Sequence, residues 1–125
     1  MPRESSVVSR TRILYAGLAY DGSHVIKTNG EGEPDLIGVI DGFAVVTECK
    51  QPGEKPRPLQ MAKLRKWAQG GAFACWTDGE KIVRVNYAGV ETDVVEFPKS
   101  PKGWYDLRRL IKKTAYEDVI RDGDE

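Results

Sequence analysis

The sequence has few of the residues that redox, zinc and membrane chemistry require. It contains one histidine and two cysteines, and each cysteine lies in an apolar, strand-like run, where a buried thiol is expected. The single His24 has no sequence neighbours with which it could form a zinc site. No apolar run approaches the roughly 18 residues of a membrane span, and the N-terminus lacks the apolar core of a signal peptide. We therefore expect a cytoplasmic protein without a membrane partner.

The chain also lacks net charge, because its 19 basic and 19 acidic residues cancel. This balance argues against a protein that coats nucleic acid by bulk attraction. The distribution is uneven, however: residues 55–76 carry five basic side chains and no acid, and residues 99–113 carry six against one. Charge alone favours two solvated helix faces, and it leaves local contacts with nucleic acid open.

The 125 residues are expected to form a single domain, residues 1–125, with a core over about 4–87 and a C-terminal extension. Helices are predicted over residues 2–20, 58–69 and, in the extension, about 103–121. Strands are predicted over residues 23–30, 36–40, 43–48, 72–77, 81–87 and 93–97. Residues 36–40 and 43–48 are apolar on both faces, which is typical of an α/β fold whose central mixed sheet is flanked by helices.

The Asp-Gly dipeptide at residues 41–42 predicts a two-residue hairpin turn with positive φ. In that register the numbers of opposed residues sum to 83, so Asp35 faces Glu48 with the two Cβ atoms about 4.5–5.5 Å apart. Since alternate residues share a face, Lys50 and Glu33 are expected on the same side. A three-residue turn would reverse the facing of one strand.

Two opposed carboxylates beside apolar residues repel each other, and the repulsion grows as water is excluded. Lys50 supplies one positive charge, and a divalent cation such as Mg²⁺ or Mn²⁺, which prefers oxygen ligands, could supply more. A metal-bound water near a lysine can act as a nucleophile toward a phosphoryl group. The alternative is a structural ion network of Asp35, Lys50 and Glu48 at the sheet edge, which the residues alone favour for an arbitrary hairpin.

A resemblance to a known family supports the metal site. Residues 34–35 (Pro-Asp), 12 intervening residues and the Glu-Cys-Lys at 48–50 resemble the signature of the PD-(D/E)XK nuclease superfamily. The longer stretch from about residue 4 to 77 resembles the VRR-NUC branch, which has Gly-x-Pro-Asp-Leu-Ile, a hairpin, Glu-x-Lys, a Pro-Gly loop and a helix bearing Gln. Small members of this branch are stand-alone nucleases, several of them from phages.

The resemblance implies a restriction-endonuclease-like core and a divalent-metal-dependent DNA endonuclease that cuts branched or junction DNA, such as a Holliday junction, as a homodimer. A bacterial or phage-infected host cell would then be its setting. A catalytically inactive module that binds nucleic acid or assembles with other chains is the alternative on the same fold. The residues do not exclude RNA as a substrate, because attack on a phosphate requires no contact with a base.

Carried over by position, the resemblance makes Asp35, Glu48 and the backbone carbonyl of Cys49 ligands of Mg²⁺ or Mn²⁺. It assigns Lys50 to positioning or deprotonating the attacking water.

The resemblance also implies two further catalytic residues. Gln60, at the start of its helix, would reach back to orient Lys50 or a phosphate; without the resemblance it is an exposed polar residue at a helix start. Glu4 would be the acid of the first helix. An acid in a first turn is also ordinary helix-dipole complementarity, so both interpretations of Glu4 stay open.

Two surfaces are predicted from the residues near the site and in the extension. Backbone phosphates are expected to contact four side chains on the loop and helix after the catalytic strand: Lys55, Arg57, Lys63 and Arg65. The homodimer is expected to use the apolar side of the C-terminal helix, which carries Trp104, Tyr105, Leu107, Leu110 and Ile111. Alternatively, that helix closes the core of its own subunit.

Overall fold

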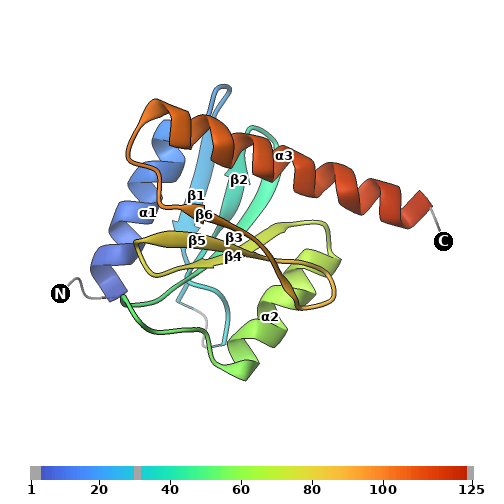
Figure 1. The fold of residues 1–125 in the computed structure, drawn as a ribbon, viewed down its shortest axis with the longest axis horizontal. Coiled ribbons are helices and arrows are strands. Elements are labelled where there is room, and N and C mark those ends of the chain that lie inside the picture. Colours follow the sequence, from blue (N-terminus) through green and yellow to red (C-terminus); the bar gives the residue numbers. More distant parts are fainter. Residues whose placement is uncertain (1–3, 30–31, 124–125) are drawn as a thin grey trace.

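The computed structural model describes residues 4–29 and 32–123, with side chains described as far as Glu117. It contains one six-stranded mixed sheet in the order β1-β2-β3-β4-β5-β6, flanked by three helices (Figure 1). The elements are α1 (Glu4–Leu18), β1 (Ser23–Lys27), β2 (Leu36–Ile40), β3 (Phe43–Cys49), α2 (Pro58–Gln69), β4 (Phe73–Thr77), β5 (Lys81–Val85), β6 (Glu91–Glu96) and α3 (Pro101–Gly123). This confirms the predicted α/β architecture, and it is consistent with a PD-(D/E)XK-like core.

The sheet is antiparallel except at its centre, where β3 and β4 are parallel and α2 makes the crossover between them. A parallel pair needs such a long connection, because its two strands start at the same edge. Helices α1 and α3 pack on one face of the sheet and α2 packs on the other. Strand β3 is therefore covered on both sides toward its C-terminal end, where residues 45–49 are all buried.

The predicted register of the β2–β3 hairpin is confirmed. Ile40 pairs with Phe43 and Leu36 with Thr47, so opposed residue numbers sum to 83. Residues 41–42 have φ values of 52° and 85°, as a two-residue turn of the primed type requires. The expectation that both faces are covered fails near the turn, where Val39 and Ala44 are exposed, because α2 packs on β3, β4 and β5 and does not reach this end of the hairpin.

Helix α1 buries the stripe that the sequence predicted, at Val7, Thr11, Leu14 and Leu18. The predicted helix began at residue 2, which lies outside the described residues, as does Gly30 at the end of the first predicted strand. The described part of the helix ends at Leu18, two residues before the predicted end.

The two cysteines are buried free thiols, as expected. Cys75 lies 3.2 Å from the Thr47 hydroxyl and 3.6 Å from the Tyr15 hydroxyl. Burial raises the pKa of Cys75 to about 11 and raises the pKa of Cys49 well above its usual range. Neither thiol is therefore a reactive nucleophile at neutral pH.

Helix α3 begins at Pro101, two residues before its predicted start, and it packs against the core of its own subunit. Leu107, Leu110 and Ile111 are buried in the same cluster as α1. The alternative interpretation of this helix is thus correct for these three residues, and they cannot also form an exposed dimer surface. Trp104 and Tyr105 are partly exposed, and dimerisation stays a prediction. No helix among the described residues is long and apolar enough to cross a bilayer.

Candidate active site

Three of the predicted catalytic residues gather where β3 ends. Asp35 directly precedes β2, Glu48 is the penultimate residue of β3, and Lys50 follows the strand. The Asp35 and Glu48 side chains are hydrogen-bonded to each other, and the charge of Lys50 acts on Glu48. Asp35 Oδ2 also accepts a hydrogen bond of 2.8 Å from the Cys49 N–H, which holds this carboxylate against the end of β3. The structure therefore brings Asp35, Glu48 and Lys50 together.

Burial gives this carboxylate pair unusual electrostatics. Glu48 is only 4% exposed and Lys50 only 5%. Desolvation, the hydrogen bond with Asp35 and repulsion by Asp35 together raise the pKa of Glu48 to about 8, although Lys50 acts in the opposite direction. At neutral pH the pair therefore retains a proton unless another cation takes its place.

The position of Lys50 follows from the parallel pairing of β3 and β4. Cys49 is the last residue of β3 and pairs with Thr77, and the Lys50 N–H donates to the Thr77 carbonyl at 2.8 Å. This bond continues the ladder one residue beyond the strand, so the backbone of Lys50 is fixed by the centre of the sheet. Such support on a rigid element keeps a catalytic side chain in place.

Glu4 is the first described residue of α1 and lies near the same corner. Burial and the charge of Asp35 raise the pKa of Glu4, and Lys50 partly compensates. Among the described residues, no group of three His, Cys, Asp or Glu side chains could hold a metal ion. The structure thus places Glu4 within electrostatic range of Asp35, but it does not assemble a three-acid ligand set.

Gln60 reaches back as expected, but toward the start of its own helix. Its Oε1 accepts a hydrogen bond of 2.9 Å from the Arg57 N–H. This is one half of a capping box; the other half is absent because an Arg side chain has no acceptor. This bond involves only Oε1, and the contact with Lys50 or a phosphate stays a prediction.

Glu33 does not join the cluster, contrary to the prediction that it shares a face with Lys50. Its carboxylate lies 3.2 Å from Lys63 Nζ and accepts a 3.2 Å hydrogen bond from Trp67 Nε1, and these two partners lower its pKa. Strand β2 begins only at Leu36, so the alternation of a strand does not extend back to Glu33. Trp67 is 34 residues away, and no local pattern in the sequence could have indicated this contact.

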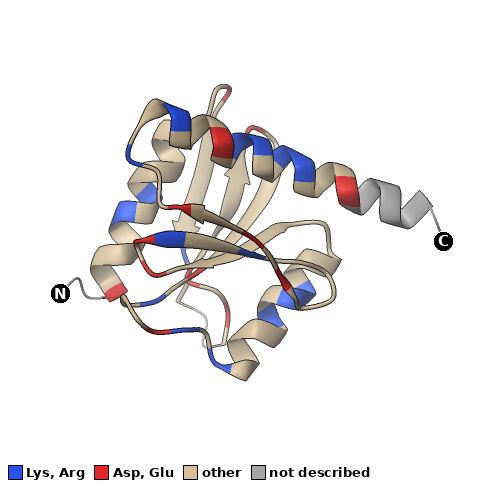
Figure 2. Cartoon of the chain, in the orientation of Figure 1, with Lys and Arg blue, Asp and Glu red and all other residues tan. Residues whose placement is uncertain are grey.

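The four basic residues predicted to contact phosphates do not form one surface. Lys55 and Arg57 are exposed on the loop before α2. Lys63 pairs with Glu33, whereas the Arg65 side chain lies against Gly89 in the turn between β5 and β6. Residues two apart on a helix point in roughly opposite directions. Figure 2 shows basic residues, coloured blue, both on this loop and on α2.

Comparison with known proteins supports a nuclease. No protein-family model matches the chain. Over 59 residues the chain is 37% identical to a protein of Acyrthosiphon pisum secondary endosymbiont phage 1 that is named "Putative nuclease p44". The match covers 46% of this chain and 59% of that relative, so the chain spans less than two thirds of the relative's length.

Proposed function

We propose that the protein is a divalent-metal-dependent DNA endonuclease that hydrolyses phosphodiester bonds. The observation that carries the proposal is the buried Asp35–Glu48 pair beside Lys50 at the end of β3. Two buried carboxylates in contact with each other are unfavourable when both are ionised and no cation is bound. The raised pKa of Glu48 reflects this cost. The similarity to a phage protein named as a nuclease supports the same reaction class.

The donor set at this corner fits a hard divalent cation. Asp35 and Glu48 offer carboxylate oxygens, and the backbone carbonyl of Cys49 is the third proposed ligand. A site with few protein ligands suits Mg²⁺ or Mn²⁺, because Mg²⁺ usually keeps several waters. When bound, the ion would supply charge stabilisation for the phosphoryl oxygens.

The side chains of the protein would supply the remaining steps. Asp35 is held in place by the Cys49 N–H, and Glu48 must lose its proton before it can act as a ligand. Lys50 would position or deprotonate the water that attacks phosphorus, and the bond to the leaving oxygen would then break. Gln60 would orient Lys50 or a phosphate, and Glu4 would add negative charge beside Asp35.

The proposed substrate is branched or junction DNA, and the proposed assembly is a homodimer. Two copies of a single-site subunit would place two sites symmetrically, as cleavage of opposed strands requires. Lys55 and Arg57, exposed on the loop beside the site, are the basic residues best placed to contact backbone phosphates.

Cleavage assays test the proposal. Plasmid and synthetic branched DNA are incubated with Mg²⁺ or Mn²⁺ and with wild type, Asp35→Asn, Glu48→Gln or Lys50→Met. Wild type should cut, and each variant should lose activity, as should wild type in EDTA. Lys102→Ala, an exposed change on α3, is the control. Cleavage that persists in all three site variants would overturn the assignment. Metal-independent binding of branched DNA, with no cleavage of DNA or RNA, would favour the inactive module instead.

A further inference from the structure

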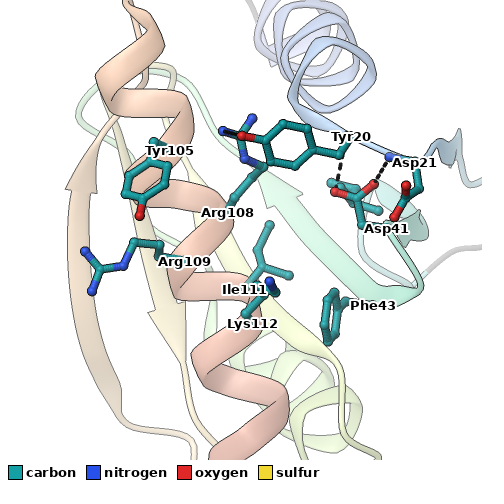
Figure 3. Close-up of a pocket in the computed structure, with 10 residues that line it drawn as sticks. Tyr20, Asp21, Asp41, Phe43, Tyr105, Arg108, Arg109, Ile111 and Lys112 are labelled. Carbon is teal, nitrogen blue, oxygen red and sulfur yellow. Dashed lines mark hydrogen bonds between the residues drawn. The ribbon is translucent and has the colours of Figure 1, made fainter.

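A second candidate site lies at the opposite end of the β2–β3 hairpin. Here the turn of the hairpin, the chain just after α1 and the middle of α3 enclose a cavity of about 240 Å³ (Figure 3). Phe43, at this end of β3, is five residues from Glu48, so the cavity is about 16 Å from the proposed metal site along the strand. The cavity is therefore separate from the carboxylate pair.

The cavity combines an apolar floor with aromatic walls. Ile40 and Ile111 are buried beneath it, and the ring of Phe43 is partly exposed to it. Tyr20 and Tyr105 lie on either side of Arg108 in Figure 3 and are 77% and 51% exposed. Large exposed rings beside an apolar floor offer a flat ligand both stacking and burial.

Three cationic side chains of α3 line the same cavity. Arg108 is held in place: its guanidinium donates to the Leu18 carbonyl and to the Tyr20 hydroxyl, each at 3.0 Å, and lies 4.1 Å from the centre of the Tyr20 ring. These contacts fix the Tyr20 ring. Arg109 and Lys112 are exposed on the same helix, so their charges are accessible to a ligand.

The acidic residues at this end of the hairpin do not cancel that charge. The Asp41 carboxylate accepts hydrogen bonds of 3.0, 2.6 and 3.2 Å from the N–H groups of Tyr20, Asp21 and Gly22. Its negative charge is therefore already compensated by three main-chain dipoles. With Asp21 as the other acid, three cations face two carboxylates around the cavity.

We propose that this cavity binds one nucleotide unit of an unpaired DNA strand. The base would stack against Phe43 and Tyr105, and the adjoining phosphate would lie at Arg109 and Lys112. Aromatic stacking combined with basic side chains is how proteins bind single strands without reading sequence. A duplex would not fit, because its bases are covered by their stacked neighbours. The inference rests on the proposed nuclease function, for which it supplies a contact with an unpaired arm of the substrate.

Binding measurements in EDTA test this site separately from catalysis. The anisotropy of a labelled oligo(dT) is titrated with the full chain, with Arg109→Ala/Lys112→Ala and with Tyr105→Ala. Each variant should weaken binding by at least about fivefold, and the double variant should flatten the slope of log affinity against log salt by about 1.4. Lys102→Ala and Tyr116→Ala change exposed α3 residues outside the cavity, and they should bind like wild type.

Competition with dTMP distinguishes a free nucleotide from a strand. Displacement of oligo(dT) by millimolar dTMP in wild type would assign the cavity to single nucleotides as well, whereas displacement by unlabelled oligo(dT) alone would assign it to the strand. Wild-type affinity in both cavity variants, or no binding of either ligand, would overturn the inference. If wild type cleaves DNA while those variants bind normally, only the inference fails. If binding depends on the cavity but no DNA is cleaved, only the nuclease proposal fails.

Discussion

The two ends of the β2–β3 hairpin each hold an aspartate, and the two aspartates have opposite electrostatic environments. At the turn, Asp41 accepts three main-chain hydrogen bonds, and these lower its pKa. At the other end, Asp35 is hydrogen-bonded to Glu48, whose pKa rises to about 8 because it is buried against another acid. The same residue type thus accepts main-chain hydrogen bonds at one end and lies beside a buried second acid, at the proposed metal site, at the other.

The difference lies in which donors surround each carboxylate. Main-chain N–H groups of the segment between α1 and β1 donate hydrogen bonds to the Asp41 carboxylate, so its negative charge stabilises the fold. Around Glu48, burial and the neighbouring Asp35 raise the pKa, and the charge of Lys50 lowers it only in part. A buried carboxylate with too few hydrogen-bond donors around it either keeps its proton or binds a positively charged ligand.

Replacing the two aspartates should separate these roles most strongly in cleavage. Asp35→Asn keeps the size of the side chain but removes a proposed metal ligand, so we expect the rate to fall by at least about a hundredfold. Asp41→Asn should cleave within about twofold of wild type. Initial rates on branched DNA with Mg²⁺ check this, and equal losses in both variants would contradict the comparison.

The pH dependence of stability should also distinguish the two ends. Because the folded pKa of Glu48 is raised, the metal-free folded state binds more protons than the unfolded state between about pH 4.5 and 8. The free energy of unfolding should therefore fall as pH rises through this window, by at most about 1.4 kcal/mol per pH unit. Urea unfolding at pH 5 and 8 measures it.

Two controls accompany that measurement. Glu48→Gln should remove the fall between pH 5 and 8. Added Mg²⁺ should stabilise wild type more at pH 8 than at pH 6, since the ion binds the ionised carboxylates. A wild-type stability that rises with pH across the window would show that Glu48 does not hold its proton as described.

Asp41→Asn should have a smaller effect on stability. Asparagine tolerates the positive φ of this position, so the change mainly removes one acceptor oxygen and the charge. We expect the free energy of unfolding at pH 7 to fall by about 1 kcal/mol. Because the pKa of Asp41 is lowered, its contribution is present above about pH 4 and is lost as pH falls further. The variant should therefore lose less stability between pH 5 and 3 than wild type, and thermal melts compare the two.

The smallest effect concerns the basic residues beside the carboxylate end. Lys55→Ala/Arg57→Ala should flatten the slope of log affinity against log salt for duplex DNA by roughly 2, as expected for two lost phosphate contacts. Lys63→Ala/Arg65→Ala should flatten it less, because Lys63 pairs with Glu33 and Arg65 lies on another side of the helix. Slopes unchanged from wild type in both double variants would return all four residues to an ordinary solvated surface.

Local rules predicted the hairpin but failed for side chains with distant partners. The Asp-Gly turn and strand alternation were sufficient to give the register from Leu36–Thr47 to Ile40–Phe43, and Asp35 and Glu48 interact just beyond its last pair. They could not indicate that Glu33 contacts Trp67 on α2, because that contact depends on how a helix is placed over the sheet. Gln60 is an intermediate case: its position in the first turn of α2 was predicted, but the sequence left open whether it contacts the site or is an exposed polar residue, and it did not indicate the cap that Gln60 forms.

The C-terminal helix shows the same limit. The sequence predicted the apolar face of this helix, but such a face is equally compatible with burial in a dimer interface and with burial in the core of its own subunit. Only the packing of Leu107, Leu110 and Ile111 against the α1 side of the sheet decided between them.

By itself, the sequence determined the order of strands and helices, the turn at residues 41–42 and the pairing of the two acids, because each depends on residues close along the chain. The tertiary structure alone decided the burial of Glu48 and Lys50, and with it the raised pKa. It also decided the cavity built from the chain just after α1, the hairpin and α3. Solvent exclusion and the enclosure of a cavity require several segments to pack at once, so no local pattern can specify them.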